Sequence, residues 1–368
     1  MARQPKIAYV LLRNAYFGPR LASSVELCVR DLARHSRHAS STLVVCPRID
    51  APFEDVEVIP VPEVMAGGNV AKALAVGRLL RRRGADLAIV ENHLPAAALI
   101  AAASGAPTIL HSHAYEKAPS GAVKRAERAL ELGRLAGLAF VSEDCAARFR
   151  GNFPNVRLPM RAVPNGLDMT AWSAEIPKEQ TILSVGRALD DKGHIEAMQA
   201  LLRVLPSRPD WSARFILSLT DREPQTVARL EAMARRLDGR IRIDRSLPYA
   251  EVRAAWERAA IGLVLTKTPE PFGRTALEAL ATGTALVTSG LGGLAEVTGP
   301  EAEIASPTDA DAVAQALARL MDSPERRAEL ARAGRARAER LYDIRVVAER
   351  MDGFVGEVLA SRQKLGGA

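Results

Sequence analysis

Short aliphatic runs alternate with amphipathic stretches through the first half of the chain. Apolar runs of about 4–8 residues predict β-strands, and apolar positions spaced three and four residues apart predict helices. The clearest helical patterns cover residues 24–34 and 70–83. The predicted strands are residues 7–12, 41–46, 56–59, 87–90, 108–111 and 138–141.

The pattern then starts again, which indicates a second domain. The predicted elements of this second series are strands at residues 182–186, 214–219, 241–244, 261–265 and 285–288, and helices at 248–259, 274–281 and 309–321. Strands that alternate with helices indicate parallel sheets covered on both faces, so the predicted fold class is α/β with two Rossmann-like, doubly wound domains.

The domain borders follow from the Pro-Asn-Gly turn at residues 164–166 and the aperiodic stretch after it. We expect an N-terminal domain at residues 1–170 and a second domain at 171–340. Residues 341–368 form a further helical pattern, which we expect to pack back on the N-terminal domain. Ligands of doubly wound folds bind at the carboxyl ends of the strands, so we expect the site in a cleft between the domains.

The composition is that of a globular protein, with 48% hydrophobic and 25% charged residues among 368. No apolar run approaches the roughly 20 residues that a spanning helix needs, and the N-terminus lacks a secretory signal pattern. The three cysteines, Cys28, Cys46 and Cys145, are far apart and odd in number, which is typical of reduced thiols. These features predict a cytoplasmic protein.

The net charge of +7 is concentrated in the first half, in clusters at residues 34–38, 81–83 and 124–128. These clusters are either ordinary solvated helix faces or the mark of an anionic partner, such as an acceptor or an anionic membrane surface. Aromatic residues make up only 4%, and no recognition motif is present, so nucleic acid is not an expected partner.

Residues 270–278, Glu-Pro-Phe-Gly-Arg-Thr-Ala-Leu-Glu, follow a predicted strand and open a predicted helix. Gly273 permits a tight turn, and the amides at the helix start suit a diphosphate. Glu270 and Glu278 lie on either side of that helix start and would accept hydrogen bonds from sugar hydroxyls. Two glutamates at this spacing are usually ordinary surface residues, but the flanking Pro-Phe-Gly and Ala-Leu-Ala-Thr-Gly favour a binding role.

A second segment, Val-Gly-Arg-Ala-Leu-Asp-Asp-Lys-Gly at residues 185–193, places two cations in the loop after a predicted strand. Arg187 offers a planar fork and Lys192 a point charge, and together they could neutralise a diphosphate. Alone, this segment would be read as a solvated basic loop.

The two segments resemble the E-x7-E motif and the G-R-x4-K-G phosphate loop of retaining glycosyltransferases with the GT-B fold, specifically family 4. Residues 163–168, Val-Pro-Asn-Gly-Leu-Asp, are similar to that family's P-N-G-x-D segment between the domains. Residues 289–296, Ser-Gly-Leu-Gly-Gly-Leu-Ala-Glu, resemble its G-G-x-x-E element. The matches follow the family's order, and the first half of the chain matches more weakly.

The resemblance implies a site for a nucleotide diphosphate sugar. It assigns Arg187 and Lys192 to the diphosphate of the donor. It assigns Glu270 to hydroxyls of the transferred sugar and Glu278 to the ribose. The remaining donor contacts that it implies are Gly186, Phe272, Gly273, Arg274 and Thr275.

His113 resembles the family's histidine near the donor sugar, at the end of the strand in Thr-Ile-Leu-His-Ser-His. His111 is the alternative, and it would point to the opposite face if the strand continued. The sequence departs from the family where a glycine pair usually precedes the first helix. The candidates for the acceptor side are therefore Gly18, Ser23 and Ser24.

Neither a metal nor a cofactor is expected. Asp309-Ala-Asp311 could suggest a metal site, but it opens a helix after Pro-Thr, so helix capping is preferred. Because Arg187 and Lys192 would already neutralise the diphosphate, we expect no essential metal. The glycines of residues 290–293 lack the third spaced glycine of a dinucleotide fingerprint.

The resemblance implies a hexosyltransferase that retains the anomeric configuration and uses a UDP- or GDP-linked donor. We expect the acceptor to be a hydroxyl of a glycan or glycolipid, in bacterial lipopolysaccharide, exopolysaccharide or glycolipid synthesis at the cytoplasmic face of the inner membrane. One alternative is a sugar-nucleotide epimerase or a phosphorylase on the same fold, whose additional site residues are not evident. The other is a non-catalytic sugar-nucleotide-binding subunit.

Overall fold

The computed structural model describes residues 3–12, 15–19, 23–49, 51–62, 68–219 and 225–366. The chain forms two compact units. Unit 1 contains the residues up to Gly166 and those from Ile344 onward, and unit 2 contains Leu167–Asp343. The chain thus passes from one unit to the other a few residues away from the expected borders at 170 and 340.

Unit 1 is built on a parallel sheet with the strand order β3-β2-β1-β4-β5-β6-β7. Its strands are β1 Ile7–Val10, β2 Thr42–Cys46, β3 Glu57–Pro60, β4 Leu87–Glu91, β5 Thr108–Ser112, β6 Gly137–Phe140 and β7 Met160–Ala162. The sequence predicts β1 to β6. It misses β7, because this short edge strand is only partly buried and lacks an apolar run.

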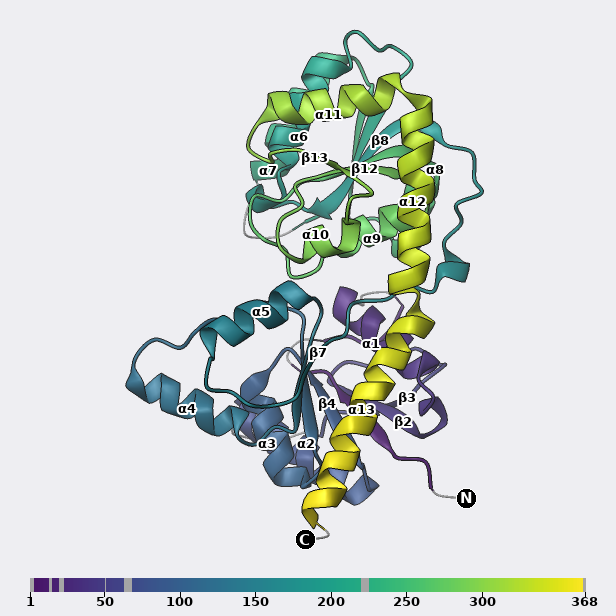
Figure 1. Cartoon of the computed structure of the whole chain (residues 1–368). Coiled ribbons are helices and arrows are strands. Elements are labelled where there is room, and N and C mark those ends of the chain that lie inside the picture. The colour runs from purple at the N-terminus through teal and green to yellow at the C-terminus, as the bar shows by residue number, and fades with distance from the viewer. Residues whose placement is uncertain are drawn as a thin grey trace. The chain divides into compact units, whose positions relative to one another are not determined.

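The helices of unit 1 are labelled in Figure 1, and polar side chains cap the start of some of them. They are α1 Ser24–His35, α2 Gly68–Arg83, α3 Leu94–Ser104, α4 Ala122–Leu132, α5 Glu143–Asn152 and α13 Ile344–Gly366. Ser23 and Glu26 form a capping box at the start of α1. Ser142 accepts a hydrogen bond from the Cys145 amide at the start of α5, and Gly105 ends α3 in the left-handed conformation.

Helix α13 is part of unit 1, although it comes last in the sequence. Its Phe354 packs so closely on β6 that a Cβ atom at Gly137 would lie 2.7 Å from the phenyl ring. Asp352 accepts hydrogen bonds from the Ser36 hydroxyl at 2.5 Å and the Arg37 amide at 2.8 Å, at the end of α1. Apolar and polar contacts therefore join the last helix to the first.

Unit 2 has a second parallel sheet, with the strand order β10-β9-β8-β11-β12-β13. Its strands are β8 Glu179–Arg187, β9 Ser212–Ser218, β10 Ile241–Arg245, β11 Ala259–Val264, β12 Ala285–Thr288 and β13 Glu303–Ile304. Its helices are α6 His194–Val204, α7 Gln225–Ala234, α8 Tyr249–Arg258, α9 Arg274–Ala281, α10 Gly293–Thr298, α11 Ala310–Asp322 and α12 Pro324–Tyr342. The sequence predicts β8 to β12, whereas the two-residue β13 is too short to give a pattern.

In both sheets the strand order reverses at the first strand of the unit. β1 pairs with β2 and β4, and β8 pairs with β9 and β11. Loops at the carboxyl ends of strands diverge on either side of such a reversal and leave room for ligands. The candidate residues lie in these loops: Glu91 ends β4, Arg187 ends β8, and Glu270 follows β11.

Candidate functional site

A buried histidine fixes the loop after β8. The His194 Nδ1 atom lies 3.2 Å from the Ser184 hydroxyl, and its Nε2 lies 3.1 Å from the Arg187 carbonyl oxygen. Because a carbonyl oxygen only accepts, Nε2 carries the proton and Nδ1 accepts from Ser184. Burial lowers the pKa of His194 to about 4, so the ring is neutral near pH 7. A Cβ at Gly186 would lie 3.1 Å from His194 Nε2, which favours glycine there.

The Arg187 side chain is exposed on this loop. It has no hydrogen-bond or ion-pair partner within the described parts of the chain. Its position is set through the backbone, because the carbonyl oxygen accepts from His194 and from the Leu189 amide at 2.8 Å. The result is an exposed, uncompensated guanidinium on a well-defined backbone, which suits an anionic ligand.

The segment after β11 turns sharply into helix α9. The Glu270 amide donates to the Leu291 carbonyl at 3.1 Å, and the Gly293 amide donates to the Glu270 carbonyl at 2.7 Å. Gly273 has φ 102°, and a Cβ there would lie 2.7 Å from Leu294 Cδ1, so only glycine fits. These contacts tie the loop after β11 to the loop after β12.

Helix α9 begins without a side-chain cap. The amides of Gly273 and Thr275 have no hydrogen-bond partner among the described residues. Unpaired N–H groups and the helix dipole give such a terminus a partial positive charge. The start of α9 therefore has the features that favour an anion, and the binding of a diphosphate there stays a prediction.

Lys192 and Glu270 are brought together in unit 2. Lys192 ends the 3₁₀ turn Asp190–Lys192, and its ammonium group forms an ion pair with the Glu270 carboxylate. Their side chains are 17% and 22% exposed, so a ligand can reach both of them. The sequence assigns these residues to different parts of the donor, and the structure shows them in direct contact.

Lys267 is a third cation in this region, and the sequence does not predict a binding role for it. Its Nζ lies 2.6 Å from Glu196 and 2.9 Å from Asp190, and these carboxylates outweigh burial and raise its pKa. Its amide donates to the Asp191 carbonyl at 2.8 Å. Lys267 thus joins the loops after β8 and β11, and its charge is already compensated.

Glu278 lies one turn inside α9 and is only 3% exposed. Its Oε1 accepts from the Tyr249 hydroxyl at 2.8 Å and lies 3.2 Å from Arg274 Nε. Burial raises the pKa of Glu278, and Arg274 and Tyr249 oppose that rise. The Arg274 side chain therefore belongs to a buried network with Glu278. Tyr249 comes from α8, and no sequence spacing could have linked it to this group.

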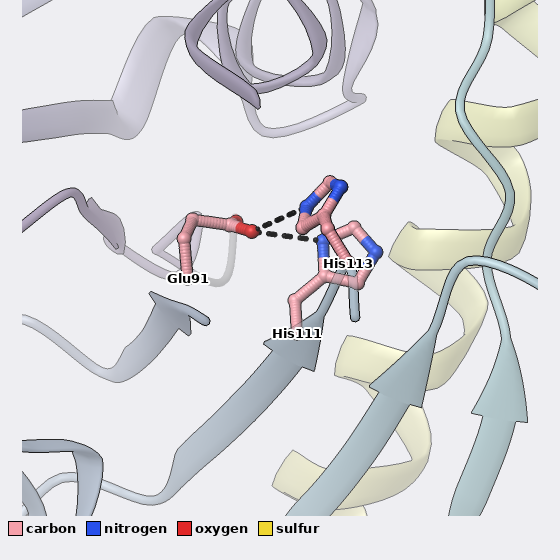
Figure 2. A group of neighbouring side chains, drawn as sticks. All are labelled: Glu91, His111 and His113. Carbon is pink, nitrogen blue, oxygen red and sulfur yellow. Dashed lines mark hydrogen bonds and ion pairs between the residues drawn. The ribbon is translucent and has the colours of Figure 1, made fainter. Parts of the chain in front are cut away.

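Unit 1 holds a second cluster at the ends of β4 and β5 (Figure 2). Glu91 Oε2 lies 2.8 Å from His113 Nε2 and 3.2 Å from His111 Nδ1. The two imidazole rings are 4.4 Å apart. The condition for His111 and His113 to point to opposite faces, a strand that continues through both, is not met, because β5 ends at Ser112 and the chain bends at His113.

Two asparagines complete this cluster. Asn92 has a left-handed backbone with φ 57°, and its Oδ1 accepts from the His113 amide at 2.6 Å. Non-glycine residues seldom adopt this conformation, and they concentrate at functional sites. Asn165, from the predicted turn at 164–166, lies near His113 and acts to raise its pKa, against the effect of burial. No motif in the sequence marks Glu91 and Asn92, although they directly follow a predicted strand.

The predicted acceptor residues have visible structural roles. Ser23 caps α1, and Ser24 is the first residue of that helix. A Cβ at Gly18 would lie 2.1 Å from the Ala51 carbonyl oxygen, so the site requires glycine. Unit 1 also has a hollow of about 370 Å³, open to solvent, lined by Leu12, Pro47, Val61, Asn69, Lys72, His93 and Ala96. Gly18, Ser23 and Ser24 do not line it, and their acceptor role stays a prediction.

Two groups bear on metal binding. Asp309 accepts hydrogen bonds from the amides of Asp311 and Ala312, so the predicted capping of α11 is confirmed. Among the described residues, Glu91, His111 and His113 have potential ligand atoms within 4.8 Å of one another. His111 Nδ1 lies 3.2 Å from Glu91 Oε2 without a hydrogen bond, and its Nε2 lies 3.2 Å from the Val163 carbonyl oxygen.

Two family models match successive parts of the chain. Glycosyltransferase Family 4 matches residues 25–171, and Glycosyl transferases group 1 matches residues 170–337. Together they extend over both units. The chain therefore belongs to the group 1 glycosyltransferases of family 4, and the family resemblance seen in the sequence is confirmed.

Curated relatives are similar over parts of the chain. Glycogen synthase of Mycobacterium tuberculosis is 32% identical over 50% of this chain and 45% of its own length. The lipopolysaccharide core biosynthesis mannosyltransferase LpcC of Rhizobium leguminosarum is 28% identical over 45% of this chain and 46% of its own. The GDP-mannose-dependent monoacylated alpha-(1-6)-phosphatidylinositol monomannoside mannosyltransferase of Corynebacterium glutamicum is 24% identical over 82% and 84%. The chain thus spans about half the length of two of these relatives.

Solved structures share the whole architecture. A glycosyltransferase from Rickettsia africae superimposes with a TM-score of 0.81 at 15% identity, covering 97% of this chain and 99% of that one. Anabaena HepE in complex with UDP and glucose gives a TM-score of 0.75 at 17% identity, covering 97% and 100%. These similarities confirm the predicted GT-B fold class.

Within the described ranges, the structure has no helix that is both long enough and apolar enough to cross a membrane.

Proposed function

We propose that the protein transfers a hexose from a nucleoside diphosphate sugar to a hydroxyl group, and that unit 2 binds the donor. The observation that carries this proposal is the exposed, unpaired guanidinium of Arg187 on the same sheet edge as the uncapped start of α9. A diphosphate needs both fixed cations and oriented N–H groups as it leaves. Lys192 adds a second cation, which the ligand would share with Glu270.

The transfer is proposed to retain the anomeric configuration without a covalent intermediate. Glu270 is paired with Lys192, and Glu278 is buried against Arg274 and Tyr249. Neither carboxylate is held as an isolated nucleophile of the glycosidase type. The acceptor hydroxyl then attacks on the face from which the diphosphate departs, and a phosphate oxygen takes its proton. No essential metal is proposed, because protein cations and amides receive the charge.

Different residues of unit 2 are proposed to contact different parts of the donor. Glu270 accepts from hydroxyls of the transferred sugar, and Glu278 accepts from the ribose. Gly186, Phe272 and Thr275 complete the proposed donor surface of unit 2, and His113 is the proposed catalytic residue of unit 1. The UDP and glucose bound by HepE and the GDP-mannose of the Corynebacterium relative support a UDP- or GDP-linked hexose.

The proposed acceptor is a glycan or a lipid-linked glycan, in lipopolysaccharide, exopolysaccharide or glycolipid synthesis. The names of the Rhizobium and Corynebacterium relatives support this class. Helix α4 supports contact with an anionic membrane surface, because Val123 and Leu130 are 72% and 70% exposed. They are seven residues apart and share one face, and Lys124 and Arg125 are exposed on other faces of the same helix. Apolar and basic side chains on one exposed helix are typical of interfacial binding.

A donor screen tests the proposed function. Purified protein is melted with UDP-, GDP- and ADP-linked sugars in the presence of EDTA, and a true donor raises the melting temperature by mass action. Donor hydrolysis without acceptor is then measured for each sugar that binds. The anomeric configuration of the transferred sugar is assigned by proton NMR. Retention supports the mechanism, and an inverted product contradicts it.

A further inference from the structure

Glu91 is a buried carboxylate, and it needs a neighbouring positive charge. It is 4% exposed, and its Oε1 has no hydrogen-bond partner within the described residues. Only Oε2 is engaged, by His111 and His113 (Figure 2). A buried charge is stable only when an opposite charge accompanies it. At least one of the two imidazoles must therefore be protonated.

The surroundings of His111 identify it as that cation. Its Nδ1 lies 3.2 Å from Glu91 Oε2, and its Nε2 lies 3.2 Å from the Val163 carbonyl oxygen. A neutral imidazole has one N–H donor and one lone pair. A neutral ring that donates from Nε2 to Val163 would turn its Nδ1 lone pair towards the carboxylate oxygen. An imidazolium instead places a positive charge beside Glu91, in an ion pair without an aligned hydrogen bond from Nδ1.

His113 is left as the neutral partner. Its Nε2 lies 2.8 Å from the same Glu91 oxygen, so this nitrogen must carry a proton. A second cation with its ring centre 4.4 Å from that of His111 would place an excess positive charge in a buried site. Nδ1 of His113 therefore keeps its lone pair. The hydrogen bond from the His113 amide to Asn92 fixes the backbone from which the ring projects.

We propose that Glu91 and His111 form an internal ion pair that holds His113 as the neutral tautomer with its proton on Nε2. Glu91 and His111 are positioning residues, and His113 Nδ1 keeps a lone pair that can accept a hydrogen bond from a sugar hydroxyl. The role towards sugar rests on the proposed function, whereas the charge assignment stands without it.

The electrostatics of the neighbouring groups agree with this assignment. Burial alone would raise the pKa of Glu91, but the two histidines outweigh it and lower the pKa to about 2. Burial opposes a rise in the pKa of His111, and Glu91 more than offsets it. Burial and the charge of His111 lower the pKa of His113. Tyr9 on β1 also faces this charge, and burial together with Glu91 raises its pKa, so Tyr9 stays neutral.

Nitrogen-15 NMR of the imidazole rings in the whole wild-type chain tests the charge assignment directly. The chain has six histidines, and the single variants H111N and H113N assign the two signals. At pH 7.5 we expect both nitrogens of His111 to show the shifts of protonated nitrogen. We expect His113 to show one protonated Nε2 and one unprotonated Nδ1. A cationic His113, or a neutral His111, would overturn the proposal.

The variant E91Q tests the positioning role, with E357Q as a matched control. Glu357 pairs with Arg161 on the surface of unit 1, away from the cluster. Without its counter-ion, His111 should titrate about 2 pH units lower in E91Q. A glutamine can donate as well as accept, so the tautomer of His113 is no longer enforced. We expect kcat to fall roughly tenfold or more, with donor KM within about twofold of wild type.

The outcomes distinguish the charge assignment of the two histidines from the positioning role of Glu91 and from the proposed function. Unchanged kcat in a folded E91Q would overturn the positioning role. If the wild-type NMR states are as expected but no sugar is transferred from any donor, the charge assignment stands and the proposed function fails. If E91Q does not fold, the wild-type NMR measurement alone decides the assignment.

Discussion

The Lys192 ammonium group forms an ion pair with the Glu270 carboxylate in unit 2. The two residues are 78 positions apart in the chain, in two segments that the family resemblance assigns to the donor. A lysine paired in this way is not a free phosphate ligand. In the proposed site, an entering diphosphate would share Lys192 with Glu270, and Lys192 would return to that carboxylate when the diphosphate leaves.

Removal of the carboxylate should therefore tighten product binding while it slows turnover. In E270Q, Lys192 has no counter-ion, so we expect the Kd of the nucleoside diphosphate to fall about threefold or more. The kcat should fall at least tenfold, because an acceptor for the sugar hydroxyls is weakened. Calorimetry and initial rates measure the two effects.

The matched control for this variant is E303Q. Glu303 pairs with Arg319 and Arg326 elsewhere in unit 2, so its loss should leave both quantities near wild type. Weaker nucleotide binding in E270Q than in E303Q would contradict the proposed competition between Glu270 and the diphosphate.

Arg187 should matter for activity and not for folding. Its side chain is exposed and has no partner among the described residues, so R187A should melt within about 1 °C of wild type. Its proposed diphosphate contact predicts a loss of kcat/KM of roughly 10²-fold. R203A removes an exposed arginine that pairs with Asp311, and it serves as the control. Near-wild-type kinetics in R187A would contradict the proposed contact between Arg187 and the diphosphate.

His194 should make the stability of unit 2 sensitive to mild acid. Its pKa falls from 6.5 in the unfolded chain to about 4 in the fold because of burial. The unfolded chain therefore binds the proton first, and the free energy of unfolding should fall as the pH drops from 6.5 to 4. A difference of one pKa unit corresponds to about 1.4 kcal/mol, so the free energy of unfolding should fall by about 3 kcal/mol over this pH range.

The variant H194F is the comparison for that measurement. It keeps an aromatic ring beside Phe215, whose centre lies 6.0 Å from that of His194, but it cannot titrate. Urea unfolding at several pH values should show a shallower pH dependence for H194F than for wild type. Donor affinity should also fall, because the hydrogen bond to the Arg187 carbonyl is lost. If the free energy of unfolding depends on pH equally in the two proteins, His194 is not the group that titrates.

Helix α4 should contribute to membrane binding. Co-sedimentation with vesicles that contain an anionic lipid, at low salt, should be reduced several-fold in the double variant V123D/L130D. L219D is the control, because Leu219 is a comparably exposed apolar residue of unit 2, at 51%. Equal binding of the two variants would exclude α4 as the contact.

The sequence predicts most of the fold because its signals are local. The central strands are aliphatic runs, and the chain repeats its alternation of strands and helices, so the two α/β domains can be recognised. β7 and β13 are missed because short edge strands pair through the backbone and need few apolar side chains. The order of the strands follows from tertiary packing, which no single segment encodes.

The candidate site is predicted only in part, for a related reason. Arg187, Lys192, Glu270 and Glu278 lie in contiguous segments with glycine and proline markers, so the sequence reveals them. Tyr249 and His194 act through contacts with side chains or carbonyl groups that only the fold brings near. Glu91 and His111 had no visible partner in the sequence, because their contact joins the ends of two adjacent strands.

The central claim is that unit 2 binds a nucleoside diphosphate without a metal. Isothermal titration of UDP and of GDP into the full chain, in buffer with EDTA, tests it most directly. We expect at least one nucleotide to bind at a single site with a micromolar Kd, and we expect R187A to weaken that binding at least tenfold. Absence of saturable binding in EDTA, with recovery on addition of magnesium, would contradict the account.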